Sequence, residues 1–396
     1  MTVDVPRVLL FTGKGGVGKT SSAAGTATLA ARRGLRTLVL STDAAHSLAD
    51  AFATPIGSEP TPVRENLWVE QVDAQRRFEE SWGEIQGYLV TVLDTVGVDP
   101  ITAEELTVIP GAEEVLALLG LRQHVLSGRW DVIVVDCAPT AETLRLLALP
   151  EALGWYFARV FGVQRKVVKA LRPVLTRAAG VPMPEDSVFD AIQRLHGELD
   201  EVQRILSGPT ASVRLVLTPE TVVVAEARRS LTTLSLYGYR VDGVIANRVF
   251  PAAGSDPWLT GWVDAQATVL DEVRQSFAGL PIWVSQYQPG EPVGAEVLAD
   301  FIATAYGDDD PLLPVSGDGP MNVRRTETGA VLEIALPFAS KADVDLARHG
   351  DELVLTVGSY RRLLALPAAL TRLRVAAARV EGGSLQVRFV QEVEQQ

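Results

Sequence analysis

The sequence lacks most of the residues from which disulfide-bonded or metal-bound domains are built. Its 396 residues include one cysteine, Cys137, which excludes disulfides and four-thiolate metal sites within a chain. The histidines show no ligand spacing; they are His46, His124, His196 and His349. We therefore expect no zinc site.

Long apolar runs and a basic N-terminus are also missing. No segment approaches the roughly 18 consecutive apolar residues that span a bilayer. The N-terminus, "MTVDVPRVLLF", has neither the basic region nor the apolar stretch of a signal peptide. The net charge of −13 disfavours non-specific binding to nucleic acid. Together these features predict a cytoplasmic globular protein, with length enough for more than one domain.

A glycine-rich segment stands near the N-terminus, "VLLFTGKGGVGKTSSAAG". The spacing Gly13-x4-Gly18-Lys19-Thr20 matches the phosphate-binding loop of nucleotide hydrolases. In such a loop the backbone N–H groups point into one concavity, and the following helix adds the positive end of its dipole. Lys19 would contact the β- and γ-phosphates of ATP, and the Thr20 hydroxyl would bind Mg²⁺. The predicted ATP-binding residues here are Gly13, Lys14, Gly15, Gly16, Val17, Gly18, Lys19, Thr20 and Ser21.

The alternative interpretation of this segment is an ordinary glycine-rich turn between a strand and a helix, which the flanking sequence disfavours. Residues 7–11 have a β-type pattern, and "TSSAAGTATLAARRG" is typical of a helix that stops at Gly34. Further apolar runs, such as "DVIVVDC", suit a parallel sheet buried on both faces. The predicted strands are 7–11, 36–42, 67–72, 131–137, 213–218, 241–247 and 281–285. With helices between them they predict a doubly wound α/β domain that binds its ligand at the carboxyl ends of the strands.

Two segments, about 75–128 and 152–207, are predicted to form a helical subdomain of residues 1–306. Apolar residues recur at helical spacing in 78–96 and again in 189–205. From Ala152 to Arg177 there are six basic residues and no acids. One interpretation is a packed helix with a solvated basic face. The other is a groove for a hydrophobic client, with transient contact to an anionic membrane or a membrane receptor.

The composition changes after Tyr306. "GDDDPLLPVSGDGP", residues 307–320, has the density of Gly, Asp and Pro that is typical of a linker. Beyond it the apolar period becomes two, in "AVLEIALP", "DELVLTVG" and "SLQVRFV". This pattern predicts a small all-β sandwich over residues 321–392.

Several motifs resemble one family of dimeric ATPases. The form K-G-G-x-G-K-T resembles the deviant Walker A loop of the class that contains partition ATPases, nitrogenase iron protein and the arsenite-pump and tail-anchored-protein-targeting (ArsA/GET) ATPases. In that class the first lysine, here Lys14, reaches the nucleotide of the partner subunit. The resemblance thus implies a homodimer, with Lys14 and Lys19 both catalytic.

Two further segments are similar to the switch motifs of the ArsA/GET family. "STDAAHS" resembles switch I and implies that Asp43 positions or deprotonates the attacking water. "DCAPTAETLRLL" resembles switch II and implies that Asp136 is the Walker B carboxylate. Thr20, Asp43 and Asp136 would then bind Mg²⁺. Cys137, Ala141 and Glu142 depart from the family's switch II pattern, which has threonine, glycine and histidine there.

Two segments resemble the part of the family that holds adenine. "VIANRVFP" implies that Asn247 recognises the base, since an amide offers both a donor and an acceptor. "YQPGEPVG", with Pro289, Gly290 and Glu291, would cover the base. "IPGAEE" at 109–114 also fits a family motif, and the resemblance covers about residues 5–305. The C-terminal segment resembles the α-crystallin domain of small heat-shock proteins, which some ATPases of this family carry.

The resemblance implies a cytoplasmic homodimeric Mg²⁺-ATPase that captures a hydrophobic client, such as a membrane-protein segment, and releases it on hydrolysis. An alternative is an ATP-regulated holdase or scaffold that acts through the C-terminal β-domain. A partition ATPase is disfavoured by "STDAAHS", by Asn247 and by the lack of a C-terminal amphipathic membrane helix. The arsenite-pump members of the family bind arsenite through several cysteine thiolates, so the resemblance together with the single Cys137 implies no arsenite site here.

Overall fold

The computed structural model describes residues 5–42, 47–71, 112–140, 143–144, 147–148, 186–252 and 256–391. The chain divides into two compact units. One contains Met1–Gln71, Ser127–Leu144 and Leu206–Gln396, and the other contains Val72–Leu126 and Arg145–Ile205. The second unit overlaps the two segments predicted to form a helical subdomain.

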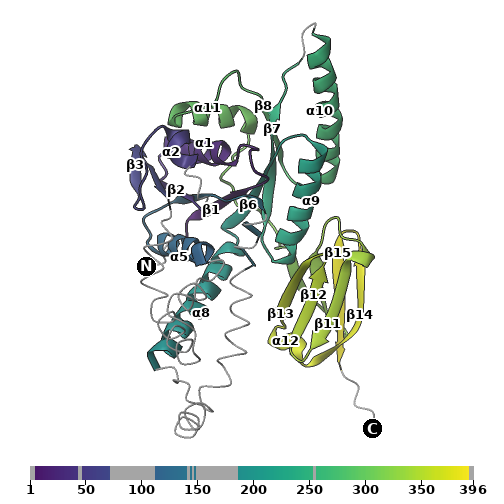
Figure 1. Ribbon diagram of the computed structural model, residues 1–396. Helices are drawn as coiled ribbons and strands as arrows, with labels where there is room; N and C mark the ends of the chain where they lie inside the picture. The colour runs from purple at the N-terminus through teal and green to yellow at the C-terminus, as the bar shows by residue number, and fades with distance from the viewer. Residues whose placement is uncertain are drawn as a thin grey trace, which may run out of the picture. The chain divides into compact units, whose positions relative to one another are not determined.

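The first unit is built on an eight-stranded sheet in the order β3-β4-β2-β5-β1-β6-β7-β8 (Figure 1). Neighbouring strands are parallel except for the antiparallel pair β3 and β4. The central strands are buried throughout, as their continuous apolar runs predict. The strands are β1 (Arg7–Thr12), β2 (Thr37–Ser41), β3 (Thr61–Arg64), β4 (Leu67–Gln71), β5 (Val132–Asp136), β6 (Ala211–Leu217), β7 (Val241–Val249) and β8 (Ile282–Gln286).

The predicted α/β class is confirmed, and all seven predicted strands are present with small shifts of their ends. The sequence analysis missed β3. This edge strand has four residues, contains Pro62 and is half-exposed, so it shows neither an apolar run nor a clean alternation.

Helices cover both faces of this sheet (Figure 1). Helices α1 (Lys19–Arg32) and α11 (Ala295–Tyr306) lie on one face, and α9 (Thr221–Leu236) and α10 (Pro257–Ser276) lie on the other. Helix α1 is rich in small residues, which lets α11 approach closely. A Cβ on Gly25 of α1 would lie 2.4 Å from the carbonyl oxygen of Leu298. The short α2 (Ser47–Phe52) follows β2.

The described part of the second unit contains α5 (Ala112–Leu126) and most of α8 (Asp186–Leu206). Arg122 of α5 joins α8 through Glu201, at 2.6 Å, and Glu198, at 3.5 Å. Leu195, Leu199 and Val202 of the predicted apolar stripe are buried in the single chain. The basic segment 152–177, which the packed-helix and groove interpretations concern, lies outside the described residues, as do the segments 75–97 and 178–185.

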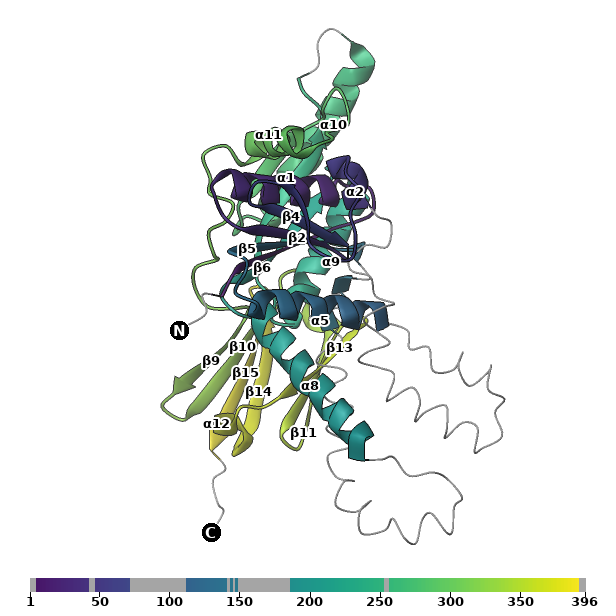
Figure 2. The ribbon, with the colours of Figure 1, turned by 90° about the vertical axis from the view of Figure 1, so that its left-hand side faces the viewer.

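The C-terminal part is an antiparallel sandwich, which confirms the predicted all-β domain. One sheet has the order β14-β15-β10-β9, seen side by side in Figure 2, and the other the order β11-β12-β13. Its core includes Leu332, Ile334, Leu355, Val387 and Phe389. The strands are β9 (Met321–Thr326), β10 (Gly329–Ala335), β11 (Val344–His349), β12 (Glu352–Val357), β13 (Tyr360–Ala365), β14 (Leu373–Glu381) and β15 (Ser384–Gln391), with the short helices η1 (Lys341–Asp343) and α12 (Ala368–Thr371).

The C-terminal end of α9 is part of this sandwich. Leu236 is fully buried in the hydrophobic core of the β-domain. The Arg362 guanidinium donates to the Leu236 carbonyl, and the Tyr237 hydroxyl donates to the Arg361 carbonyl at 3.3 Å. Thr232 of α9 also donates to the Pro337 carbonyl. The sandwich is thus packed onto a helix of the α/β domain.

Residues 307–320, predicted to be a linker, are bound along the α/β domain. Three backbone carbonyls accept hydrogen bonds from arginines of that domain. Arg214 donates to Pro311 at 2.8 Å, Arg7 to Leu312 at 3.0 Å and Arg240 to Gly317 at 2.9 Å. The composition of a linker therefore does not imply a free spacer here.

A buried ion cluster lies beneath these contacts, at the amino ends of β1, β6 and β7. Asp242 accepts from Arg214 at 2.7 Å and from Arg7 at 3.1 Å. Burial lowers the pKa of Arg7 to about 10. Burial also opposes the charged form of Arg214, but the Tyr306 hydroxyl and the Asp242 carboxylate raise its pKa above the ordinary value. Asp242 therefore compensates two buried guanidinium groups.

We expect Asp242→Asn to lower the free energy of unfolding by about 3–5 kcal/mol, because it leaves two buried cations without a compensating charge. Urea unfolding measures the change. The matched control is Asp271→Asn, which breaks an exposed pair with Arg274 at 2.7 Å. Its effect should stay within about 1 kcal/mol. Equal effects of the two variants would contradict this account of the cluster.

Candidate nucleotide-binding site

The loop between β1 and α1 has a backbone that only glycines adopt readily. Gly16 has φ 79° and Gly18 has φ 93°, both in the left-handed region. Gly18 is also the residue that precedes the first turn of α1. The free N–H groups at the start of α1 are thereby directed at the loop, which is the arrangement that binds phosphate.

Two contacts fix this loop against neighbouring strands. A Cβ on Gly13 would lie 2.0 Å from the Val216 carbonyl oxygen of β6, and a Cβ on Gly18 would lie 2.2 Å from Asn247 Nδ2 of β7. Asn247 donates from Nδ2 to the Val17 carbonyl at 2.8 Å and is 4% exposed. The asparagine predicted to recognise adenine thus also holds the loop.

The two lysines of the loop have different surroundings. Lys19 is buried, and its Nζ donates to the Lys14 carbonyl at 3.3 Å. The Lys14 side chain is exposed. A buried ammonium aimed across its own loop suits a phosphate bound in that loop. The exposed Lys14 is available to a group outside the chain.

Asp136 lies at the carboxyl end of β5, directly beside the end of β1, where it pairs in register with Phe11. The backbone continues this pairing, since the Cys137 N–H donates to the Phe11 carbonyl at 3.1 Å. The Asp136 side chain is fully buried, and the Thr20 side chain at the start of α1 is half-buried. A carboxylate and a hydroxyl are the oxygen donors that Mg²⁺ prefers, so this pair fits the predicted ion. Asp43 lies outside the described residues.

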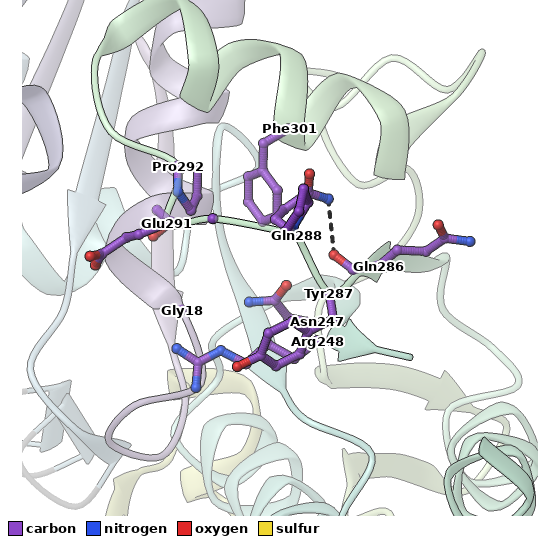
Figure 3. A pocket seen from close by; sticks show the side chains of 12 residues that line it. Gly18, Asn247, Arg248, Gln286, Tyr287, Gln288, Glu291, Pro292 and Phe301 are labelled. Atoms are coloured by element: carbon purple, nitrogen blue, oxygen red, sulfur yellow. Dashed lines mark hydrogen bonds between the residues drawn. The ribbon is translucent and has the colours of Figure 1, made fainter. Parts of the chain in front are cut away.

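A cavity of about 370 Å³ opens beside the loop, at the carboxyl ends of β7 and β8 (Figure 3). Its lining combines the loop, the end of β7 and the segment after β8, as the sequence predicts for Ser21, Asn247, Pro289, Gly290 and Glu291. The lining residues are Gly18, Ser21, Asn247, Arg248, Gln286, Tyr287, Gln288, Pro289, Gly290, Glu291, Pro292 and Phe301.

Sequence reasoning did not single out Arg248, Tyr287 or Phe301 of this lining. Arg248 has φ 56°, a strained conformation for a residue with a side chain, and such strain recurs at functional sites. Tyr287 stacks on Phe250 with ring centres 5.5 Å apart and an interplanar angle of 13°. Arg248 follows Asn247 near the carboxyl end of β7, and Tyr287 directly follows β8. The rule that ligands bind at the carboxyl ends of strands could therefore have found both residues.

Cys137 follows Asp136 and is buried. Burial, reinforced by the Asp136 carboxylate, raises the pKa of its thiol to about 12. The thiol is therefore protonated at neutral pH, whereas soft metalloid binding needs thiolates. In the described part of the chain, no three His, Cys, Asp or Glu side chains form a metal-binding group. No described helix has the length and apolar character needed to cross a bilayer.

A phosphate-binding loop, a carboxylate at the end of a neighbouring strand and a base-sized cavity at the sheet's carboxyl edge define a P-loop nucleotide-binding protein. The comparison with known proteins narrows this class. The chain matches the anion-transporting ATPase family over residues 6–307 and belongs to it. Residues 327–389 match the HSP20-like domain found in ArsA.

Two relatives align with nearly the whole chain, and a third with part of it. A protein of Prosthecochloris vibrioformis described as "Putative arsenical pump-driving ATPase" is 37% identical over 371 residues, which cover 93% of this chain and 92% of the relative. A similarly described protein of Aquifex aeolicus is 32% identical over 386 residues, which cover 95% of this chain and 98% of the relative. An ATPase ASNA1 homolog of Trypanosoma cruzi is 29% identical over 269 residues, covering 62% of this chain and 75% of the relative.

We expect Gly13→Ala to lower both the thermal midpoint and the affinity for ATP, because the new methyl group would overlap the Val216 carbonyl. The control is Gly15→Ala in the same loop, where a Cβ meets no protein atom within 4 Å. Its thermal midpoint should stay close to that of the unchanged protein. Isothermal titration with ATP and thermal unfolding measure the two effects. Equal destabilisation by both substitutions would contradict the packing argument.

Proposed function

We propose that this ATPase works in the cytoplasm as a homodimer that binds Mg²⁺-ATP and captures and releases a hydrophobic client. The observation that carries the proposal is the pair of lysines in one loop, Lys19 buried toward the phosphate site and Lys14 exposed. A chain that acts only on its own bound nucleotide needs Lys19 alone. The exposed Lys14 suits a nucleotide bound by another copy of the chain, as the family resemblance implies.

Within one chain, each group around the loop has a separate task. Lys19 and the N–H groups at the start of α1 bind the β- and γ-phosphates. Thr20 and Asp136 would hold Mg²⁺, which would supply positive charge to neutralise the phosphates. Asn247 reads the adenine edge while Pro289, Gly290 and Glu291 cover it. Asp43 orients the attacking water.

Across the dimer, Lys14 would stabilise the charge that develops on the transferring phosphoryl group of the partner's ATP. Hydrolysis would then require two chains side by side. Closure around two nucleotides supplies the energy that couples ATP binding to a change in the helical segments, where the client would bind. The client would bind the segments 75–97 and 152–206, of which Leu195, Leu199 and Val202 are buried in the single chain.

The names of the relatives point in two directions, toward an arsenical pump and toward ASNA1. A role in arsenite transport fits this chain poorly, because Cys137 is its one cysteine and its thiol is buried and protonated. A hydrophobic polypeptide client needs no thiolate. Capture of a membrane-protein segment is therefore the proposal that we favour.

The alternative, a holdase or scaffold that acts through the β-domain, meets one structural difficulty. Part of the sandwich core is filled by Leu236 of α9, and Arg362 and Tyr237 fasten the two parts together. A client entering the core at this position would have to displace the chain's own helix. The β-domain is better placed to support the ATPase domain than to open.

Asp43→Asn tests the proposal, since it should retain ATP binding and lose hydrolysis, which would lengthen the client-bound state. We expect this variant, isolated from cells with Mg²⁺-ATP, to retain proteins that carry one hydrophobic C-terminal segment. The control is Asp43→Asn combined with Gly13→Ala, which should lose ATP and client together. Retention of unrelated unfolded proteins would favour the holdase alternative, and retention of nothing would contradict client capture.

A further inference from the structure

The outer face of the four-stranded sheet of the β-domain carries a group of arginines. Strand register places Arg324 of β9 and Arg388 of β15 in one row, on either side of Val331 of β10. Arg379 pairs with Gln386 in the next row, and Arg374 with Val390 in the row on the other side. Residues paired in register share a face of the sheet. We call Arg324, Arg374, Arg379 and Arg388 the arginine face.

The four side chains of the arginine face are exposed. None of them forms an ion pair or a side-chain hydrogen bond with the residues that the structure describes. Several arginines on the surface of the α/β domain are used differently. Arg32, Arg36 and Arg64 on the surface of the α/β domain are each paired with a carboxylate. The guanidinium groups of the arginine face therefore keep their donors for a partner.

Acids offset only part of the positive charge of this surface. By register, Glu333 and Glu381 lie on the same side of the sheet. Glu333 accepts from Ser384 at 3.1 Å and from Gln386 at 3.4 Å, and Glu381 lies at the hairpin end of β14. The positive charge stands against a chain with a net charge of −13, so it is a local feature.

The shape and chemistry of the face indicate its partner. Strands lie about 4.8 Å apart and alternate residues about 6.8 Å apart, so these arginines spread over a flat area about 14 Å by 14 Å. Single-stranded nucleic acid is usually bound by stacking on aromatic rings, and the residues paired across this face include none. A duplex is read by an element that enters a groove, which a flat sheet does not. Small apolar residues, Val331, Ala377 and Val390, separate the charges.

We propose that the arginine face docks the protein on the surface of a bilayer that contains anionic phospholipids. Each guanidinium donates to phosphate oxygens of the headgroups, and the flat sheet brings all four into contact at once. No aromatic side chain enters the bilayer, so the contact is electrostatic and reversible. This docking is independent of ATP hydrolysis, because the arginine face shares no residue with the nucleotide site.

The test uses the full chain in flotation with vesicles of phosphatidylcholine, with and without phosphatidylglycerol. We expect binding only to the anionic vesicles. Salt at about 0.5 M should abolish the binding, because it screens the attraction between surface charges. Arg324→Gln with Arg388→Gln should weaken partitioning about twenty-five-fold, since each arginine near the surface contributes about five-fold. ATP hydrolysis and the thermal midpoint should not change.

Arg325→Gln with Arg361→Gln is the matched control. Both arginines are exposed and the change in charge is identical, but Arg325 pairs with the buried Ala330 and so points to the other side of its strand, and Arg361 lies on β13 of the other sheet. This control should lose less than about three-fold. Equal losses in the two double variants would overturn the proposal. So would an absence of binding to anionic vesicles, or binding of RNA or acidic peptides in their place.

Discussion

The structure depends on the close approach of the loop at residues 13–18 to the ends of β6 and β7. Gly13 packs against the Val216 carbonyl, and Gly18 against the amide of Asn247, at distances that leave no room for a Cβ. Asn247 then donates to the Val17 carbonyl. Because three strands meet at these contacts, the sheet itself sets the position of the phosphate-binding N–H groups. The buried Lys19 and the cavity beside Asn247 follow from that position.

Strand β7 links this site to the rest of the chain. Its carboxyl end carries Asn247, and its amino end carries Asp242, the counter-ion of Arg7 and Arg214. The same two arginines bind the carbonyls of residues 311 and 312, so the segment that leads to the β-domain is attached at the edge of the sheet opposite the nucleotide site. Helix α9, which precedes β7, ends inside the core of the β-domain at Leu236. The helix that enters the core of the β-domain and the strand that carries Asn247 are thus consecutive elements of the chain.

The sequence predicts the parts of this arrangement that have a local signature. Continuous apolar runs mark the buried parallel strands, alternation marks the sandwich, and the glycine spacing marks the loop. Contacts between distant residues have no such signature. Leu236 is a core residue of the β-domain, and Arg7 and Arg214 attach residues 307–320 to the α/β domain. These contacts join residues that are far apart in the sequence and meet only in the folded chain. Arg248 and Tyr287 lie in the two segments predicted to hold adenine but were not singled out, because their place in the cavity depends on where β7 and β8 end. Asp43 and most of the predicted client segments lie outside the described residues.

The most direct test of the proposed dimer is a mixture of two inactive chains, Lys14→Ala and Lys19→Ala. In a mixed dimer the Lys14→Ala chain keeps its own Lys19 and receives Lys14 from its partner, which completes one site. Random pairing predicts that the mixture regains about a quarter of the activity of the unchanged protein per chain, while each variant alone hydrolyses almost no ATP. An inactive mixture of folded chains, with ATP bound by Lys14→Ala, would contradict the account. Full activity of Lys14→Ala alone would contradict it equally.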